Sequence, residues 1–260
     1  MIDSNNKPLQ LENLTWPDLS SKISDHCFIM PVGSVEQHGP HLPLGTDTII
    51  PVEIARIVAG KTNCIVMPPI HYGITSRPRN GGGRGFPGHT SVSGGTLMAY
   101  VKEILEDMVR HGTRKILVLS WHFENSSFLY EAIDAFYLDL HQDCKVVLVT
   151  NAPSMIKEAN LQKIFPEGFP GWDVEHASIL ETSLMMVLRP ELVDKSKLIA
   201  DGRAKRSICY DIFPPPQDII SETGVLYKSK SSSLEKGKLA LEDIVSELVS
   251  VIESEFFMRK

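Results

Sequence analysis

Residues 27–47 read CFIMPVGSVEQHGPHLPLGTD, an apolar run followed by a polar one. The apolar part, Cys27 to Val32, is short and continuous, which is typical of a buried strand. The polar part, Glu36 to Asp47, holds two histidines, two carboxylates, two glycines and two prolines, and so cannot continue a helix or a strand. We therefore expect a shaped loop at the carboxyl end of a strand, where α/β folds place their ligands.

Apolar runs alternate with helical patterns along the rest of the chain. Further strands are expected at residues 64–68, 115–120 and 145–150, and helices at 48–59, 96–111, 128–139, 179–188 and 234–256. This alternation predicts an α/β fold in which helices cover both faces of a parallel or mixed central sheet. A single layered domain accounts for all 260 residues.

The composition excludes several classes of protein. The net charge is −6 without a basic block, so nucleic acid is not expected as a partner. No apolar run approaches the length of a membrane span, and the amino terminus lacks a secretory signal. The four cysteines form no CxxC pair, which indicates free thiols in a reducing compartment and a cytoplasmic location.

A second pair of potential ligands follows the strand expected at residues 115–120. His122 and Glu124 are two positions apart and lie at a strand end, as Glu36, His38 and Asp47 do. Three carboxylates and two imidazoles suffice for two zinc or manganese ions with one bridging carboxylate. The alternative for His122 to Asn125 is a polar helix cap.

A third polar cluster, FPGWDVEH, spans residues 169–176. It offers Trp172 as an aromatic wall, Asp173 as a polar anchor and His176 as a proton carrier at the mouth of a pocket. The alternative is a capping aspartate beside a tryptophan packed on the core. Ser76 and the glycines at 81–83 could contribute polar groups to the same pocket.

Six stretches together resemble the creatininase family of metal-dependent amidohydrolases. They are ExHGPHLPxxTD (36–47), GGGxxFPGxTS (81–91), HxEN (122–125), PEGFxGWDxEH (166–176), ETSLM (181–185) and YDxFP (210–214). The resemblance runs from about Pro31 to the last helix. It implies a creatininase-like layered α/β fold that assembles as a homo-oligomer, commonly a hexamer.

The resemblance also assigns roles to individual residues. Glu36, Asp47 and His122 would bind one divalent metal, and His38, Asp47 and Glu124 a second, with Asp47 bridging. The substrate would contact Ser76, Phe123, Trp172, Asp173 and His176, with His176 and Glu124 as the catalytic groups.

Three positions depart from the family pattern. Phe123 replaces a tyrosine, Trp121 replaces a glycine, and a second tryptophan of the pocket falls at about Ala152. We expect a two-metal hydrolase that opens a small cyclic amide, with creatinine and water giving creatine. The alternatives are a family member acting on a formamide or an inosose-type ring, and a metal-binding protein without turnover.

Overall fold

Five parallel strands form the centre of the molecule. The computed structural model describes residues 8–139 and 143–258. In spatial order the strands are β1 (Leu9–Gln10), β3 (Cys64–Val66), β2 (Cys27–Val32), β4 (Lys115–Ser120) and β5 (Lys145–Val149). Every neighbouring pair is parallel, so the sheet is parallel rather than mixed.

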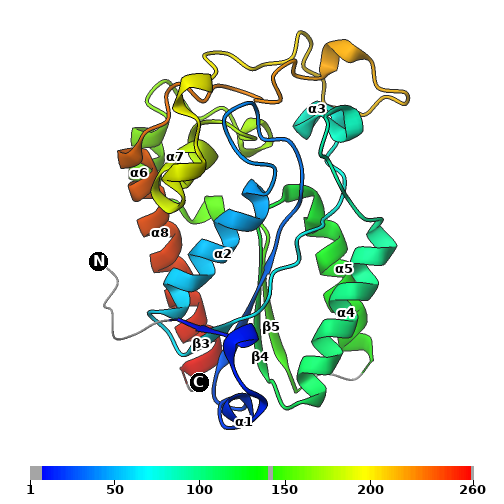
Figure 1. The fold of residues 1–260 in the computed structure, drawn as a ribbon, viewed down its shortest axis with the longest axis vertical. Coiled ribbons are helices and arrows are strands. Elements are labelled where there is room, and N and C mark those ends of the chain that lie inside the picture. The colour runs from blue at the N-terminus through cyan, green and yellow to red at the C-terminus, as the bar shows by residue number, and fades with distance from the viewer. Residues whose placement is uncertain (1–7, 140–142, 259–260) are drawn as a thin grey trace.

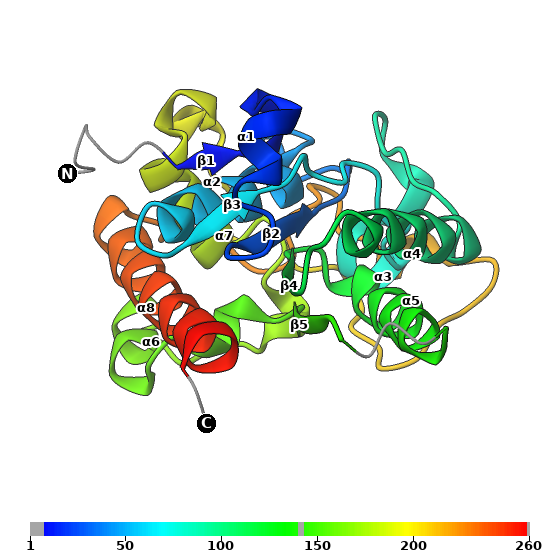
Figure 2. The same cartoon turned by 90° about the horizontal axis from the view of Figure 1, so that it is seen from below.

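Helices cover both faces of this sheet (Figures 1 and 2). One face carries α2 (Thr46–Ala59), α7 (Ile179–Leu188) and α8 (Leu234–Ile252), and the other carries α4 (Gly94–Arg110) and α5 (Ser126–Leu138). The sheet therefore lies between two helical layers, as a parallel sheet of apolar strands requires.

The strand residues are divided between two apolar cores. In β2, Cys27 and Ile29 join the core beneath α2, α7 and α8, whereas Phe28 and Met30 join the core beneath α4 and α5. Successive side chains of a strand point to opposite faces, so an unbroken apolar run serves both cores at once. This explains why the strand shows no alternation of polar and apolar residues.

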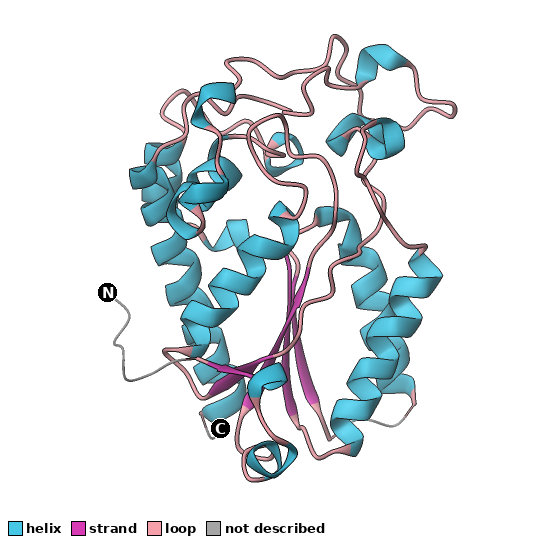
Figure 3. Ribbon diagram, in the orientation of Figure 1, coloured by secondary structure: helices cyan, strands magenta, loops and turns pink. Residues whose placement is uncertain are grey.

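The chain changes direction across the sheet at β2. From β2 it passes through α2 to β3 on one side, and then through α4 to β4 on the other side. Connections that leave in opposite directions from neighbouring strands open a crevice at their carboxyl ends. Val32 pairs with Ser120, so the loops after β2 and β4 begin at the same level. Figure 3 shows the long loops gathered at this end of the strands.

Most expected elements are present with small shifts at their ends. Helix α2 begins two residues early, at Thr46, which places Asp47 in its first turn, and α8 ends at Ile252 before a π-helical turn, Glu253–Phe257. The segment 71–95 holds the short helix α3 (Pro78–Gly81). The shortest elements were missed, among them β1, α1 (Trp16–Ser20), α3 and α6 (Glu158–Ile164).

The expected absence of a membrane span and the expected free thiols concern helix character and cysteine pairing. Among the described residues, no helix combines the length and apolar character needed to cross a membrane. All four cysteines are unpaired; Cys27, Cys64 and Cys144 are buried and Cys209 is exposed.

Candidate functional site

Four of the predicted metal ligands meet in the crevice between β2 and β4. Glu36 and His38 lie in the loop after β2, Asp47 in the first turn of α2, and His122 directly after β4. All four are almost completely buried, with exposures of 0 to 3%. Buried carboxylates and imidazoles in one cluster need compensating charges or a bound cation.

Asp47 lies between the two histidines. Its Oδ1 is 3.1 Å from His38 Nε2, and its Oδ2 is 3.1 Å from His122 Nδ1. Glu36 Oε1 lies 3.1 Å from the same His122 nitrogen. The two oxygens of Asp47 thus face two different imidazoles, which is the arrangement expected of a bridging carboxylate.

Backbone carbonyls orient both imidazoles. His38 Nδ1 lies 3.2 Å from the Glu36 carbonyl oxygen, and His122 Nε2 lies 2.9 Å from that of Ile74. A carbonyl can only accept, so these nitrogens carry hydrogen, and in a neutral ring the other nitrogen presents a lone pair to the carboxylates. A lone pair facing a carboxylate is favourable only with a cation between them, and this second hydrogen bond is typical of metal-binding histidines.

The pKa shifts describe the same requirement for positive charge. Burial by itself would lower the pKa of His38, but the carboxylates of Asp47, Glu181 and Glu36 together raise it to about 10. The pKa of His122 is raised well above its usual value against the effect of burial, chiefly by Glu36. Both shifts show that the surrounding carboxylates favour positive charge on these imidazoles or between them, which protons or cations can supply.

Two further carboxylates lie near this cluster: Glu124 beside His122, and Glu181 beside His38. Glu124 lines the same pocket; its Oε1 accepts a hydrogen bond from the Arg77 amide, and its Oε2 is 3.6 Å from His122 Nε2. The carboxylate that groups with His38 and Asp47 in the metal-free chain is that of Glu181, at 3.8 Å from His38 Nε2. The carboxylate nearest His38 after Asp47 is thus not the one expected from the sequence.

Gln37 holds His176 beside the cluster. The two amide hydrogens of Gln37 go to the carbonyl oxygens of Gly81 and Gly224, at 2.9 and 3.0 Å, and its Oε1 accepts from the Gly39 amide. Gly224 leaves no room for a side chain, because a Cβ there would lie 1.7 Å from Gln37 Oε1. The Gln37 side chain is therefore clamped in one orientation.

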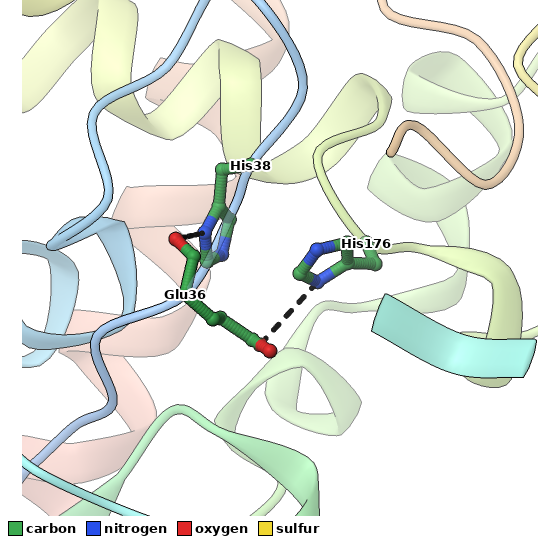
Figure 4. A group of neighbouring side chains, drawn as sticks. All are labelled: Glu36, His38 and His176. Carbon is green, nitrogen blue, oxygen red and sulfur yellow. Dashed lines mark hydrogen bonds and ion pairs between the residues drawn. The ribbon is translucent and has the colours of Figure 1, made fainter. Parts of the chain in front are cut away.

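This clamp determines the tautomer of His176. Gln37 has no amide hydrogen left for His176 Nε2, which lies 2.9 Å away, so that nitrogen must itself donate to the Gln37 carbonyl oxygen at 2.8 Å. The free nitrogen, Nδ1, points at Glu36 Oε1 from 3.8 Å (Figure 4). His176 thus presents a proton-accepting atom to the cluster.

A pocket with an empty volume of about 690 Å³ opens above the cluster. Its lining includes nine of the residues expected from the sequence, namely Glu36, Asp47, Ser76, His122, Phe123, Glu124, Trp172, Asp173 and His176. The predicted residues thus converge on one pocket, although His38 lies behind its wall.

The aromatic residues of the pocket differ in how firmly other side chains hold them. The indole N–H of Trp121 donates to Glu181 Oε1 at 2.9 Å, and its ring is buried. Phe123 is 62% exposed, and Trp172 packs on Phe169 with ring centroids 4.3 Å apart. Ala152 is fully buried in the core that also contains Trp121.

The capping alternative for residues 169–176 is wrong for Asp173. The first amides of α7, those of Ile179 and Leu180, donate to Glu175 at 3.2 and 2.9 Å. Asp173 is left exposed at the pocket. His41, the weakest candidate of its loop, bonds the Thr182 hydroxyl at 2.8 Å and belongs to none of the candidate ligand groups.

Sequence reasoning missed Gln37, Glu181 and His89. Gln37 lies within the decisive loop, but an uncharged amide drew no attention beside histidines and carboxylates. Glu181 stands in the quoted ETSLM stretch, and only its contacts with Trp121 and His38 reveal its place. His89 lies in the GGGxxFPGxTS stretch and approaches Glu36 to 3.8 Å.

Comparison with known proteins gives consistent results over nearly the whole chain. The family model for creatinine amidohydrolase matches residues 12–252. Creatinine amidohydrolase of Pseudomonas putida is 37% identical over 256 residues, covering 96% of this chain and 98% of that protein. 3-dehydro-scyllo-inosose hydrolase of Thermotoga maritima is 30% identical over 64% of this chain and 51% of that protein.

Solved structures of creatininase superpose closely on this chain. A manganese form has a TM-score of 0.92 at 37% identity, with 97% of this chain and 100% of that chain covered. A mutant creatininase complexed with creatine has the same TM-score and coverage at 36% identity.

Proposed function

Because the chain belongs to the creatininase family, we propose that it is a two-metal hydrolase that opens a small cyclic amide, converting creatinine and water to creatine. The observation that carries the proposal is Asp47, whose two oxygens each face the lone-pair nitrogen of a different buried histidine. Similarity to creatinine amidohydrolase along 96% of the chain supports the substrate.

The proposed ligand sets follow the oxygens of Asp47. Glu36 and His122 would share one divalent ion with Asp47 Oδ2, and His38 and Glu124 would share the other with Asp47 Oδ1. The first set lies within 4.8 Å in the metal-free chain. The second set requires Glu124 to turn from the Arg77 amide, an exposed and long hydrogen bond of 3.2 Å.

Zinc or manganese would fit this donor set of nitrogen and carboxylate oxygen. Two such ions would make a water molecule acidic and would act as Lewis acids toward a carbonyl oxygen. The buried, hydrogen-bonded imidazoles keep the ligand atoms in place before any ion arrives, so little ordering is needed on binding.

His176 would move the proton that ring opening requires. Hydrolysis joins the oxygen of water to the amide carbon, breaks the carbon–nitrogen bond of the ring and delivers a proton to the departing nitrogen. His176 Nδ1 is unprotonated in the neutral ring and faces the cluster, so it can accept this proton and then deliver it. His176 Nε2 keeps donating its hydrogen bond to the backbone carbonyl oxygen of Gln37 while Nδ1 gains and loses the proton.

The remaining pocket residues would hold a flat ring. Trp172 and Phe123 offer aromatic faces, while Ser76 and Asp173 offer an oxygen each. Ser76 Oγ is buried without a partner among the described residues, so a substrate group would satisfy it.

Phe123 and Ala152 support a second candidate, a family relative acting on a different ring or on a formamide. The similarity to 3-dehydro-scyllo-inosose hydrolase supports this candidate. A metal-binding protein without turnover is a weaker alternative, because His176 is present and its Nδ1 faces the cluster.

We also propose that the protein is a cytoplasmic homo-oligomer, specifically a hexamer. Sedimentation analysis would test the oligomeric state.

The experiment that tests the proposal combines metal analysis with turnover. We expect two equivalents of zinc or manganese per chain and hydrolysis of creatinine in wild type. His176→Gln should retain both metals and lose about 10²- to 10⁴-fold in kcat. Full metal content without creatinine turnover would reject the substrate, and a panel of inosose-type and formamide substrates would then identify the alternative.

A further inference from the structure

His89 lies behind the metal cluster with both ring nitrogens unused. Its side chain is 2% exposed, and neither Nδ1 nor Nε2 has a hydrogen-bond partner among the described residues. The next residue, Thr90, donates its amide to the Val35 carbonyl oxygen at 2.9 Å, which anchors this loop beside Glu36. A buried imidazole without partners costs free energy and therefore calls for an explanation.

Glu36 supplies the matching acceptor. Its Oε1 lies 3.1 Å from His122 Nδ1, inside the cluster, whereas its Oε2 lies 3.8 Å from His89 Nδ1. Oε2 is buried and accepts no hydrogen bond from the described residues. One oxygen of Glu36 is thus directed at the proposed metal and the other at an unused imidazole.

The backbone of Gly81 packs against Glu36 Oε2. A Cβ at Gly81 would lie 3.1 Å from Glu36 Oε2 and 2.6 Å from Ser76 Oγ, so no side chain can fill that side. His89 does not line the open pocket and belongs to none of the three ligand groups found among the described residues. Direct coordination by His89 is therefore not supported.

We propose that His89 is a positioning residue that donates a hydrogen bond from Nδ1 to Glu36 Oε2 and so holds Oε1 on the metal. The approach from 3.8 Å to hydrogen-bond distance requires only a small movement of either side chain. His122 and His38 cannot take this role, because their N–H groups are already given to carbonyl oxygens. The inference rests on the proposed metal site and not on the identity of the substrate.

The role of His89 can be separated from a merely structural one. Outer-shell partners of metal ligands are worth about 10- to 100-fold in metal affinity. His89→Ala removes the donor and should weaken Mn²⁺ binding by this factor, measured by competition with a chelator. His89→Asn places an amide nitrogen close to the position of Nδ1 and should restore most of the affinity.

The controls compare metal-free and metal-loaded protein. His111→Ala alters an exposed histidine at the end of α4, at the opposite end of the sheet, and should leave Mn²⁺ affinity unchanged. The thermal unfolding midpoint of His89→Ala should fall less in the metal-free protein than in the Mn²⁺-loaded protein, because only the loaded form also loses metal-binding free energy. The midpoint of the Mn²⁺-loaded variant should fall below that of loaded wild type.

Three results would overturn the inference. They are wild-type Mn²⁺ affinity in His89→Ala, failure of His89→Asn to recover what His89→Ala loses, and equal destabilisation of the metal-free and loaded forms. Wild type that binds neither Mn²⁺ nor Zn²⁺ would reject this inference together with the metal site. Wild type that binds metal but does not hydrolyse creatinine would reject only the proposed substrate.

Discussion

The floor and the mouth of the pocket are built in different ways. The floor, made of Glu36, Asp47 and His122, is at most 3% exposed, and backbone carbonyls orient its histidine. The mouth contains Phe123, which is 62% exposed, and Asp173, which is also exposed. The floor can therefore carry a fixed chemistry while the mouth tolerates change.

The contacts that hold the two regions differ in strength. The floor depends on buried hydrogen bonds between charged groups, and losing one partner leaves a buried charge unpaired. At the mouth, Arg77 and Arg79 pair with Asp211 in partly exposed ion pairs, which contribute little to stability. Substitutions at the floor should therefore alter metal binding, and those at the mouth should alter substrate choice.

The largest expected effect is that of Asp47→Ala at the floor. Because Asp47 faces both His38 and His122, its loss should remove both metal ions and reduce turnover to background. Elemental analysis of the purified variant measures this directly, with the exposed Asp107→Ala as the matched control. Two full equivalents of metal in the Asp47 variant would contradict the bridging role.

Gln37→Ala should have the next largest effect, because Gln37 clamps the loop that holds His176. We expect kcat to fall by about 10²-fold, the usual result of a small misplacement of a catalytic group, with KM and metal content little changed. Gln162→Ala on the exposed face of α6 is the control. A loss of metal equal to the loss of rate would instead assign Gln37 to the floor itself.

The stability of the metal-free protein should depend on pH through His38. Its pKa is about 10 in the folded chain against 6.5 for an unperturbed imidazole, so the proton is bound more tightly in the folded state. This contribution is fully present below pH 6.5 and is lost as the pH rises toward 10. Chemical unfolding of the metal-free protein should show stability falling over this interval, whereas metal affinity rises as protons are displaced.

A reduced slope in His38→Gln would attribute this pH dependence to His38. The same slope in wild type and His38→Gln would place the titrating group elsewhere. The matched control is His111→Ala, which alters an exposed histidine at the end of α4 and should leave the slope unchanged.

The smallest expected effect is that of Phe123→Tyr at the mouth. The ring is largely exposed, so an added hydroxyl can remain in water, and kcat/KM for creatinine should change by no more than about two- to threefold. Metal content should not change at all. A change of tenfold or more would show that the mouth closes on the substrate and buries this position.

The sequence alone was sufficient to predict the long elements and to propose the candidate ligands. The apolar runs of β2 and β4 were predicted with their observed bounds, because burial on both faces of a parallel sheet makes a strand continuously apolar. The bounds of α7 were also predicted correctly, and the helix ends before Pro190. The short elements β1, α1 and α6 were missed, because a few residues carry no periodicity. Glu36, His38, Asp47 and His122 were recognised because carboxylates and imidazoles were concentrated at strand ends.

Only the tertiary structure decided which atoms meet. The register of Val32 with Ser120 brings the two loops to one level, and the clamp on Gln37 determines which nitrogen of His176 is free. Likewise, the placement of Glu181 beside His38 and of His89 beside Glu36 joins residues far apart in the chain. Such contacts depend on how packed layers position their loops, and hydrophobic periodicity and local motifs carry no record of that placement.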